Sequence, residues 1–243
     1  MWRVVSADDL TLLPVWDPES NSPQQFGNNP EDASHPASQW PRFVAINPDP
    51  ARFKGQEYAE GIYNGKVQRA RIVPLSRFFY FRIDAHTMGT ASASLNGRPA
   101  RPGDYMIFVG MHVTTKEIPN WVWATFWWHD EPDRGPYAAQ RPSSVLAPWR
   151  NYLMNVSYDM NEPRETDGAP HIAFNPYLEG PLAGGLKSNC MTCHIQATWK
   201  PIQPADTTPG AISPGDRRFA DRIRLDFMWT LTDIPDPVCL ARN

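Results

Sequence analysis

The sequence has little excess charge and no long hydrophobic run. Its 23 Lys and Arg residues nearly balance 26 Asp and Glu residues, which gives a formal net charge of −3. Because there is no strongly basic field, nucleic acid and anionic membrane surfaces are not favoured as partners. No stretch approaches the roughly 18 consecutive apolar residues of a bilayer span, so no transmembrane segment is predicted. Met1-Trp2-Arg3 does not open an apolar signal segment.

Cysteine is scarce, with three residues at Cys190, Cys193 and Cys239. A structural zinc site needs four ligands and usually two cysteine pairs, so three cysteines argue against one. A thioredoxin-like dithiol follows a strand and opens a helix. Here the pair follows a glycine-rich stretch, and His194 comes directly after it, which argues against that redox motif.

The five residues Cys190-Met191-Thr192-Cys193-His194 form a C-x-x-C-H motif. This motif is typical of covalent attachment of a c-type haem, in which two thioethers hold the porphyrin and the histidine binds the iron. We therefore predict one covalent haem c, with Cys190 and Cys193 as anchors and His194 as proximal ligand. Because such haems are attached outside the cytoplasm, we expect a periplasmic protein whose export signal is absent from the numbered chain.

With two thiols engaged by haem, Cys239 has no intrachain partner. We expect it to be a buried free thiol, and an intermolecular disulfide is the alternative.

Proline and tryptophan are abundant, with 26 and 10 residues. Proline interrupts helices, which disfavours a long helical bundle. We predict a β-rich α+β fold, with an antiparallel sheet or sandwich-like body and a short C-terminal helical haem-attachment segment. We expect one domain over 1–243, made of an irregular proline-rich region 1–50, a β-rich body 51–175 and a haem-attachment segment 176–243.

Four segments are dense in β-branched and aromatic residues and are bounded by turn sequences. We expect them to form antiparallel strands over 77–83, 105–113, 121–128 and 152–158. By contrast, residues 13–50 are expected to form irregular loop, with 43–46 a strand candidate at most. The haem motif is expected on a short helix over 187–199, and apolar spacings of four predict an amphipathic helix over 216–229.

The sixth iron ligand has several candidates. His112 comes first, because it lies in an apolar strand where a buried imidazole needs a partner; a core histidine bonded to a carbonyl is the alternative. His129, next to Asp130, is second. Met228 is the only methionine after the motif, and it fits a core residue as well as a ligand. An unfilled sixth position is also open.

Two further residue types are expected near the haem. Trp123, from the tryptophan-rich segment 121–128, is expected to line the haem or an apolar cleft; a core strand packed on both faces is the alternative. Arg217 is expected to pair with a haem propionate, since guanidinium and carboxylate groups form bidentate contacts. A solvated helix face is the alternative for Arg217 and its neighbours Arg218, Arg222 and Arg224.

The chain resembles a group of bacterial exported proteins that carry one C-x-x-C-H and are identified as cytochrome c family proteins. The resemblance spans roughly Phe43 to Trp229 and rests on Val109-Gly110-Met111-His112-Val113, Thr115-Lys116-Glu117, Trp121-Val122-Trp123-Ala124-Thr125-Phe126 and Asn189 through His194. It implies a single covalent haem and a periplasmic address, and no particular reaction. Where that group has an acidic residue and a histidine after the Thr-Phe pair, this chain has Trp127-Trp128-His129.

The leading hypothesis is a periplasmic monohaem c-type cytochrome that passes electrons to a periplasmic redox partner. An alternative is a peroxidase-like haem oxidoreductase, whose iron keeps an open or labile sixth position for a small-molecule oxidant or substrate. A haem-based sensor of small ligands is the third hypothesis.

Overall fold

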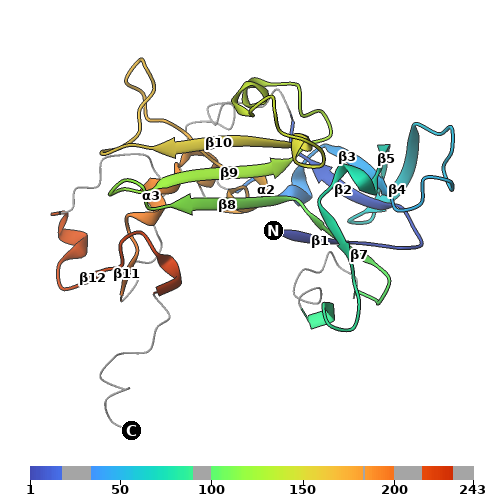
Figure 1. The fold of residues 1–243 in the computed structure, drawn as a ribbon, viewed down its shortest axis with the longest axis horizontal. Coiled ribbons are helices and arrows are strands. Elements are labelled where there is room, and N and C mark those ends of the chain that lie inside the picture. Colours follow the sequence, from blue (N-terminus) through green and yellow to red (C-terminus); the bar gives the residue numbers. More distant parts are fainter. Residues whose placement is uncertain (18–33, 90–99, 183, 200–214, 232–243) are drawn as a thin grey trace, which may run out of the picture. The chain divides into compact units, whose positions relative to one another are not determined.

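The computed structural model describes residues 1–17, 34–89, 100–182, 184–199 and 215–231. The chain forms two compact units (Figure 1). The first unit comprises Met1–His112, Thr125–Asn155 and Asn175–Leu186. The second unit comprises Val113–Ala124, Val156–Phe174 and Lys187–Asn243. Each unit is described by itself.

A four-stranded mixed sheet lies in the first unit. Its strand order is β2-β3-β5-β4, with β3 and β5 parallel and the other pairs antiparallel. The hairpin between β4 and β5 turns at Asn64 and Gly65, which both have positive φ (49° and 76°), as a tight two-residue hairpin turn requires. The strands are β2 (Thr11–Val15), β3 (Arg42–Asn47), β4 (Tyr58–Tyr63) and β5 (Lys66–Pro74).

A three-stranded antiparallel sheet, also in the first unit, has the order β1-β7-β6. Its strands are β1 (Trp2–Val5), β6 (Tyr80–Arg82) and β7 (Tyr105–Phe108). Alternate residues of a strand point to opposite faces, and on one face Val4 packs with Met106 and Ile83 in a hydrophobic cluster. Val5, on the other face, is also fully buried, so both faces of this strand pack against protein.

The third sheet has the order β10-β9-β8, and each of its strands contributes residues to both units. Its strands are β8 (Gly110–Thr115), β9 (Val122–Trp128) and β10 (Tyr152–Tyr158). In the first unit Trp127 and Trp128 are both completely buried although they point to opposite faces, and Phe78 stacks on Trp128 with ring centroids 4.0 Å apart. Paired indoles on successive residues therefore fill the core on both sides of β9.

A buried carboxylate ties separate strands of the first unit together. The carboxylate of Asp130 accepts hydrogen bonds from Arg42 at 3.3 Å and from Arg71 at 3.0 Å, while Arg77 donates to its backbone carbonyl at 2.9 Å. The Asp130 side chain is only 5% exposed. A buried ion pair of this kind holds its position only while every partner is present.

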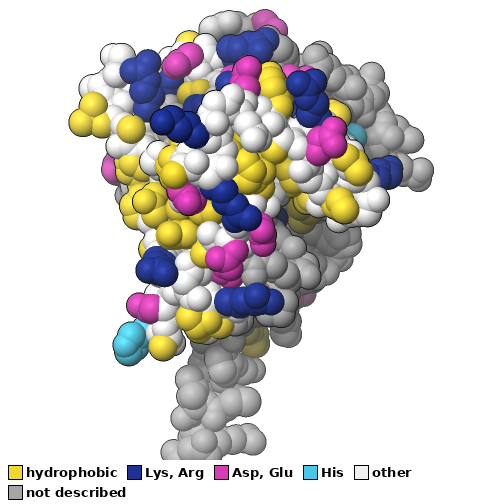
Figure 2. Space-filling view, turned by 90° about the vertical axis from the view of Figure 1, so that its right-hand side faces the viewer, with side chains coloured by type: hydrophobic (Ala, Val, Ile, Leu, Met, Phe, Trp, Pro, Cys, Tyr) yellow, Lys and Arg dark blue, Asp and Glu magenta, His cyan; other side chains and the backbone are white. Residues whose placement is uncertain are grey.

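The outer surface of the first unit mixes charges of both signs. Figure 2, which views the molecule from the right of Figure 1, shows Lys and Arg side chains interspersed with Asp, Glu and hydrophobic side chains. The described part of this face therefore presents no field of a single sign, as the net charge of the sequence predicts.

The second unit has little regular structure. It contains α3 (Cys190–His194) and a two-stranded antiparallel ladder of β11 (Thr198–Trp199) and β12 (Ile223–Arg224). The other helix described, α2 (Pro176–Glu179), belongs to the first unit. Short 3-10 helices occur in both units, at Ala37–Gln39, Leu75–Arg77, Pro136–Gln140, Trp149–Asn151, Gly185–Lys187, Arg217–Phe219 and Trp229–Leu231.

The β-rich fold class is confirmed: antiparallel and mixed sheets dominate, and the described helices are short. The expected strand over 152–158 matches β10, and that over 121–128 matches β9 to within one residue. The expected strand over 105–113 is divided into β7 and β8. Of the segment 77–83, only Tyr80–Arg82 is a strand.

Three sequence predictions are wrong. The described part of region 1–50 is not irregular throughout, because β1, β2 and β3 lie in it. The helix over 216–229 does not form: Asp221, Asp226 and Phe227 have positive φ, and Ile223 lies in β12 and is 62% exposed. The helix expected over 187–199 is restricted to Cys190–His194. One domain over 1–243 stays a prediction.

Among the helices of the described residues, none has both the length and the apolar character needed to cross a bilayer.

Candidate functional site

The C-x-x-C-H motif forms the helix α3 in the second unit. Residues i, i+3 and i+4 of a helix lie on one face, so Cys190, Cys193 and His194 share a side of α3. All three are half-buried. Met191, between the two cysteines, is only 4% exposed, because it packs in the hydrophobic core of the unit. The short helix therefore presents two thiols and one imidazole together.

Asn189 starts this helix as its N-cap. Its side-chain oxygen accepts hydrogen bonds from the backbone N–H of Thr192 at 2.7 Å and from the Thr192 hydroxyl at 2.9 Å. Its side-chain nitrogen donates to the carbonyl of His171 at 3.2 Å. Both Asn189 and Thr192 are buried. An N-cap side chain satisfies amide groups that the first turn leaves open, so a helix of only five residues is held in place.

The imidazole of His194 is oriented by a backbone carbonyl. Its Nδ1 lies 2.7 Å from the carbonyl oxygen of Phe227. A carbonyl can only accept, so Nδ1 carries the hydrogen and the lone pair of the neutral ring lies on Nε2. This arrangement is characteristic of metal-binding histidines, because the bond at one nitrogen sets the tautomer and the direction of the other.

The chain after β12 brings the Phe227 carbonyl to this position. The ladder of β11 and β12 continues in a hydrogen bond from Leu225 N–H to the carbonyl of Ala197 at 2.9 Å. Asp226 and Phe227 then adopt positive φ of 49° and 68°. For residues other than glycine this conformation costs free energy and persists only where the surrounding structure enforces it.

Aromatic side chains surround the imidazole. The Trp123 ring lies 4.4 Å from the His194 ring and 6.0 Å from the Phe227 ring, measured between centroids. Trp123 is 2% exposed and its indole N–H donates to the carbonyl of Asn120 at 2.8 Å. Trp123, Met191 and Phe227 form the buried cluster of the unit, against which Trp121, Cys190 and Ile195 pack. Trp123 therefore packs on His194 as part of a buried cluster, and its expected place beside a haem stays a prediction.

Trp121 contributes a polar group to the same cluster. Its indole N–H is buried and has no hydrogen-bond acceptor among the described residues. Its backbone is strained, with φ of 64°. The ammonium group of Lys116 lies 5.2 Å from the centre of the Trp121 ring and also pairs with the Asp226 carboxylate. A buried donor without an acceptor is costly, so this N–H is a candidate donor to a bound group.

His112 is neither buried nor without a partner, contrary to the sequence-based prediction. It lies at the end of the first unit's part of β8, its side chain is 32% exposed, and its Nε2 lies 2.7 Å from a carboxylate oxygen of Glu179. The strand expected over 105–113 is interrupted before His112, because β7 ends at Phe108 and β8 starts at Gly110. His112 and Glu179 both belong to the first unit, and His194 to the second.

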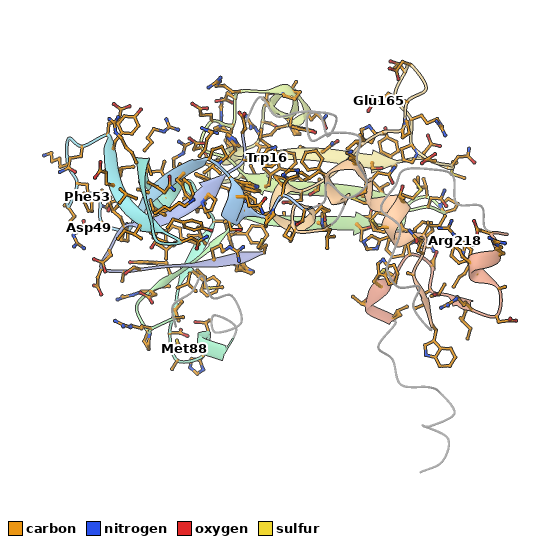
Figure 3. The ribbon with its side chains drawn as sticks, turned by 180° about the vertical axis from the view of Figure 1, so that it is seen from behind. Trp16, Asp49, Phe53, Met88, Glu165 and Arg218 are labelled. Carbon is orange, nitrogen blue, oxygen red and sulfur yellow. The ribbon has the colours of Figure 1, made fainter. Side chains whose placement is uncertain are left out.

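His129, the second ligand candidate, uses both ring nitrogens within the first unit. Its Nε2 lies 2.7 Å from the carbonyl of Trp16, and its Nδ1 accepts from the backbone N–H of Glu131 at 2.9 Å. The ring is completely buried, and this desolvation lowers the pKa of His129 below its ordinary value of 6.5. His129 is therefore a neutral core residue. Figure 3 labels Trp16, whose side chain lies among the strands of this unit.

The remaining predicted residues are not members of the aromatic cluster or lie outside the described residues. Arg217 is exposed in a 3-10 helix that Asp216 caps through the backbone N–H of Arg218; that hydrogen bond lowers the pKa of Asp216. Figure 3 shows Arg218 on the outside of the second unit. Met228 is half-buried. Cys239 lies outside the described residues.

Sequence reasoning missed Asn189, Phe227 and Trp121. Asn189 could have been found, because asparagine directly before a short helix is a common N-cap. The roles of Phe227 and Trp121 depend on a backbone carbonyl and on a buried N–H, which leave no signal in residue type.

The donor set fits the group that the motif predicts. Two thiols and one histidine lone pair lie on one helix face beside buried aromatic rings, and an indole N–H there can donate to a carboxylate. Within the described part of the chain, no group of three or more His, Cys, Asp and Glu side chains gathers to hold a metal ion. No family model matches the chain, and no curated protein or solved structure matches it.

Proposed function

We propose that this chain is a periplasmic monohaem c-type cytochrome that transfers electrons, and that it belongs with the bacterial exported cytochrome c family proteins it resembles. The observation that supports this most strongly is the hydrogen bond from His194 Nδ1 to the Phe227 carbonyl at 2.7 Å. It prepares the imidazole that follows the cysteine pair to bind iron through Nε2.

Several residues of the chain would each have a separate role in holding the haem. Cys190 and Cys193 would form the thioether bonds, and His194 would be the proximal ligand. Trp123 and Phe227 would supply an apolar wall that excludes water, and the Trp121 N–H would donate to a propionate. When bound, the haem supplies reversible one-electron chemistry at its iron. The protein contributes the position of the axial ligand, and burial that tunes the reduction potential.

The test of attachment is a pyridine haemochrome spectrum of the protein matured in a periplasm that attaches c-type haem. We expect one covalently bound haem per chain, retained after denaturation and acid–acetone extraction. The double variant Cys190→Ser/Cys193→Ser should lose it completely. Cys239→Ser, the matched control at the third cysteine, should keep it. A wild-type protein with no covalent haem would refute the proposal.

A second function, a haem oxidoreductase with an open or labile sixth position, is favoured by one observation. Several histidines are committed to their own surroundings: His129 and His171 have a hydrogen-bond partner at each ring nitrogen, and His112 has Glu179. An iron that keeps an open position can bind peroxide or another small oxidant, supplied by the surroundings.

Electron paramagnetic resonance of the oxidised protein separates the two functions. A six-coordinate low-spin iron, with the same ligands in both redox states, supports electron transfer. A high-spin iron that binds added cyanide rapidly supports the oxidoreductase. His112→Ala and Met228→Ala, measured beside the wild type, identify the sixth ligand. The variant whose iron changes from low-spin to high-spin has lost that ligand.

A further inference from the structure

A small cavity of about 160 Å³ lies within the first unit, and none of its lining residues belongs to the site around α3. Its polar lining includes Arg3 and two tyrosines, Tyr63 and Tyr177. Leu13, Pro14 and Ala37 form an apolar wall. The cavity thus combines one cation with hydroxyl groups and aliphatic surface, the mixture expected of a site for a small organic molecule.

Arg3 is directed toward the interior. In β1 it shares a face with Val5, which is completely buried, and it pairs across the ladder with Ile107, also completely buried. The opposite face of the strand carries Val4, which packs in the hydrophobic cluster with Met106. A guanidinium on a buried strand face is unusual, because charged side chains in such positions are normally paired.

No such pairing exists for Arg3 among the described residues: its guanidinium has neither a hydrogen bond nor an ion pair there. The contrast with the other arginines of the unit is sharp, since Arg42 and Arg71 both bind the Asp130 carboxylate. Desolvation lowers the pKa of Arg3, yet an arginine stays protonated in proteins. Arg3 is half-buried, and its partly desolvated charge therefore lacks the counter-charge that would offset the cost of burial.

The tyrosines have different roles in the cavity. Tyr177 is buried and donates its hydroxyl hydrogen to the carbonyl of Pro14 at 2.9 Å, which fixes this part of the wall. Burial raises the pKa of Tyr63, so its phenol is neutral and remains a hydrogen-bond donor. Arg3 and Tyr63 together offer N–H and O–H donors to one acceptor group.

We propose that this cavity binds a small aliphatic monocarboxylate. The carboxylate would pair with the Arg3 fork and accept from Tyr63, and the aliphatic part would lie against Leu13, Pro14 and Ala37. A monoanion is favoured over phosphate, because Arg3 is the one cation among the described lining residues and three of them are apolar. The inference is independent of the proposed haem function.

The test is isothermal titration and thermal unfolding of the full chain with butyrate, with inorganic phosphate and neutral butyramide as comparison ligands. We expect saturable 1:1 binding of butyrate, and a melting temperature about 5–10 °C higher at a hundredfold excess over Kd. Phosphate and butyramide should bind at least tenfold more weakly. Equal binding of phosphate, or of butyramide, would overturn the proposal.

The variant Arg3→Met separates a binding role from a structural one. If Arg3 is kept for a ligand, Arg3→Met abolishes butyrate binding and raises the melting temperature of the ligand-free protein, because an unpaired buried charge is removed. Tyr63→Phe should weaken binding about tenfold and leave the fold intact. Arg69→Met, at an exposed arginine of β5, is the matched control and should bind butyrate as the wild type does. Unchanged binding in Arg3→Met, or a lower melting temperature of the ligand-free variant, contradicts the proposal.

Discussion

The two units of the chain are stabilised in different ways. The first unit rests on strand ladders of four and three strands and on the buried Asp130, whose carboxylate binds Arg42 and Arg71 and whose backbone carbonyl binds Arg77. The second unit has a five-residue helix, a two-residue ladder and a core cluster of three buried side chains. It is also held by hydrogen bonds between side chains and backbone, such as those between Asn189 and Thr192 and between His194 and Phe227.

Backbone strain is distributed just as unevenly. Of the non-glycine residues described with positive φ, Asn64 lies in a hairpin turn of the first unit, where this conformation is ordinary. The other four, Trp121, Asp221, Asp226 and Phe227, all belong to the second unit. Strain is kept where function requires a particular geometry. Among the described residues, the first unit therefore combines strand ladders with little backbone strain, whereas the second combines a small buried cluster with most of the positive φ angles.

The largest expected effect concerns the second unit without its haem. In the Cys190→Ser/Cys193→Ser protein, amides of the second unit should exchange with solvent about 100-fold faster than in the loaded protein, because a covalent group no longer completes its core. Amides of β3 and β5 in the first unit should be unaffected. Hydrogen exchange followed by mass spectrometry measures both. Equal amide protection of the second unit in the two proteins would show that the two units do not differ in their dependence on haem.

The next largest effect is expected when the buried carboxylate of Asp130 is removed from the first unit. Asp130→Ala should lower the free energy of unfolding by about 3–5 kcal/mol, because it leaves Arg42 and Arg71 without their shared buried partner. The matched control is Asp9→Ala: Asp9 is 75% exposed and pairs with Arg52, which is 49% exposed, so the loss there should be under about 1 kcal/mol. Urea unfolding followed by tryptophan fluorescence gives both values. Similar losses for the two variants would show that burial does not distinguish them.

A smaller effect is the pH dependence of the first unit. Burial lowers the pKa of His129 in the folded protein, so between that lowered value and about 6.5 the unfolded chain binds the extra proton. Stability is therefore fully present above pH 6.5 and falls as the pH decreases below it, by at most about 1.4 kcal/mol per pH unit for one proton. In His129→Gln this part of the slope should vanish. Urea unfolding of both proteins from pH 5 to pH 8 tests it; parallel curves would contradict the assignment.

The smallest effect is expected at the surface of the second unit. Lys116 and Asp226 form an ion pair with both side chains about half exposed. Lys116→Met should cost under about 1 kcal/mol, and the difference from wild type should shrink in 1 M salt. A large or salt-independent loss would instead point to the contact of Lys116 with the Trp121 ring.

Residue patterns predicted those parts of the fold whose secondary structure depends on the local sequence. The aromatic and β-branched segments that became β9 and β10 were found because strands with buried faces have this composition. The C-x-x-C-H motif was also expected on a short helix, and α3 lies there. Both depend only on residues close together in the chain.

The remainder depends on distant contacts. β2 contains Pro14 and lies in a proline-rich region, yet it pairs with β3 from Thr11↔Ile46 to Val15↔Arg42, which no local pattern shows. Phe219, Ile223 and Phe227 have helical spacing, but the ladder with β11 and the positive φ of Phe227 override it. His112 lies in an apolar sequence and is nonetheless exposed, because β7 ends before β8 begins.

The division of the chain into interleaved segments restricts how the molecule is made. The chain crosses between the units five times, and the last segment of the first unit, Asn175–Leu186, ends just before the capped turn that starts at Cys190. During synthesis the scaffold cannot close until this segment has left the ribosome, and the two thiols follow almost at once. No single cut yields either unit alone: even a cut after Leu186, which keeps every segment of the first unit, also keeps two segments of the second.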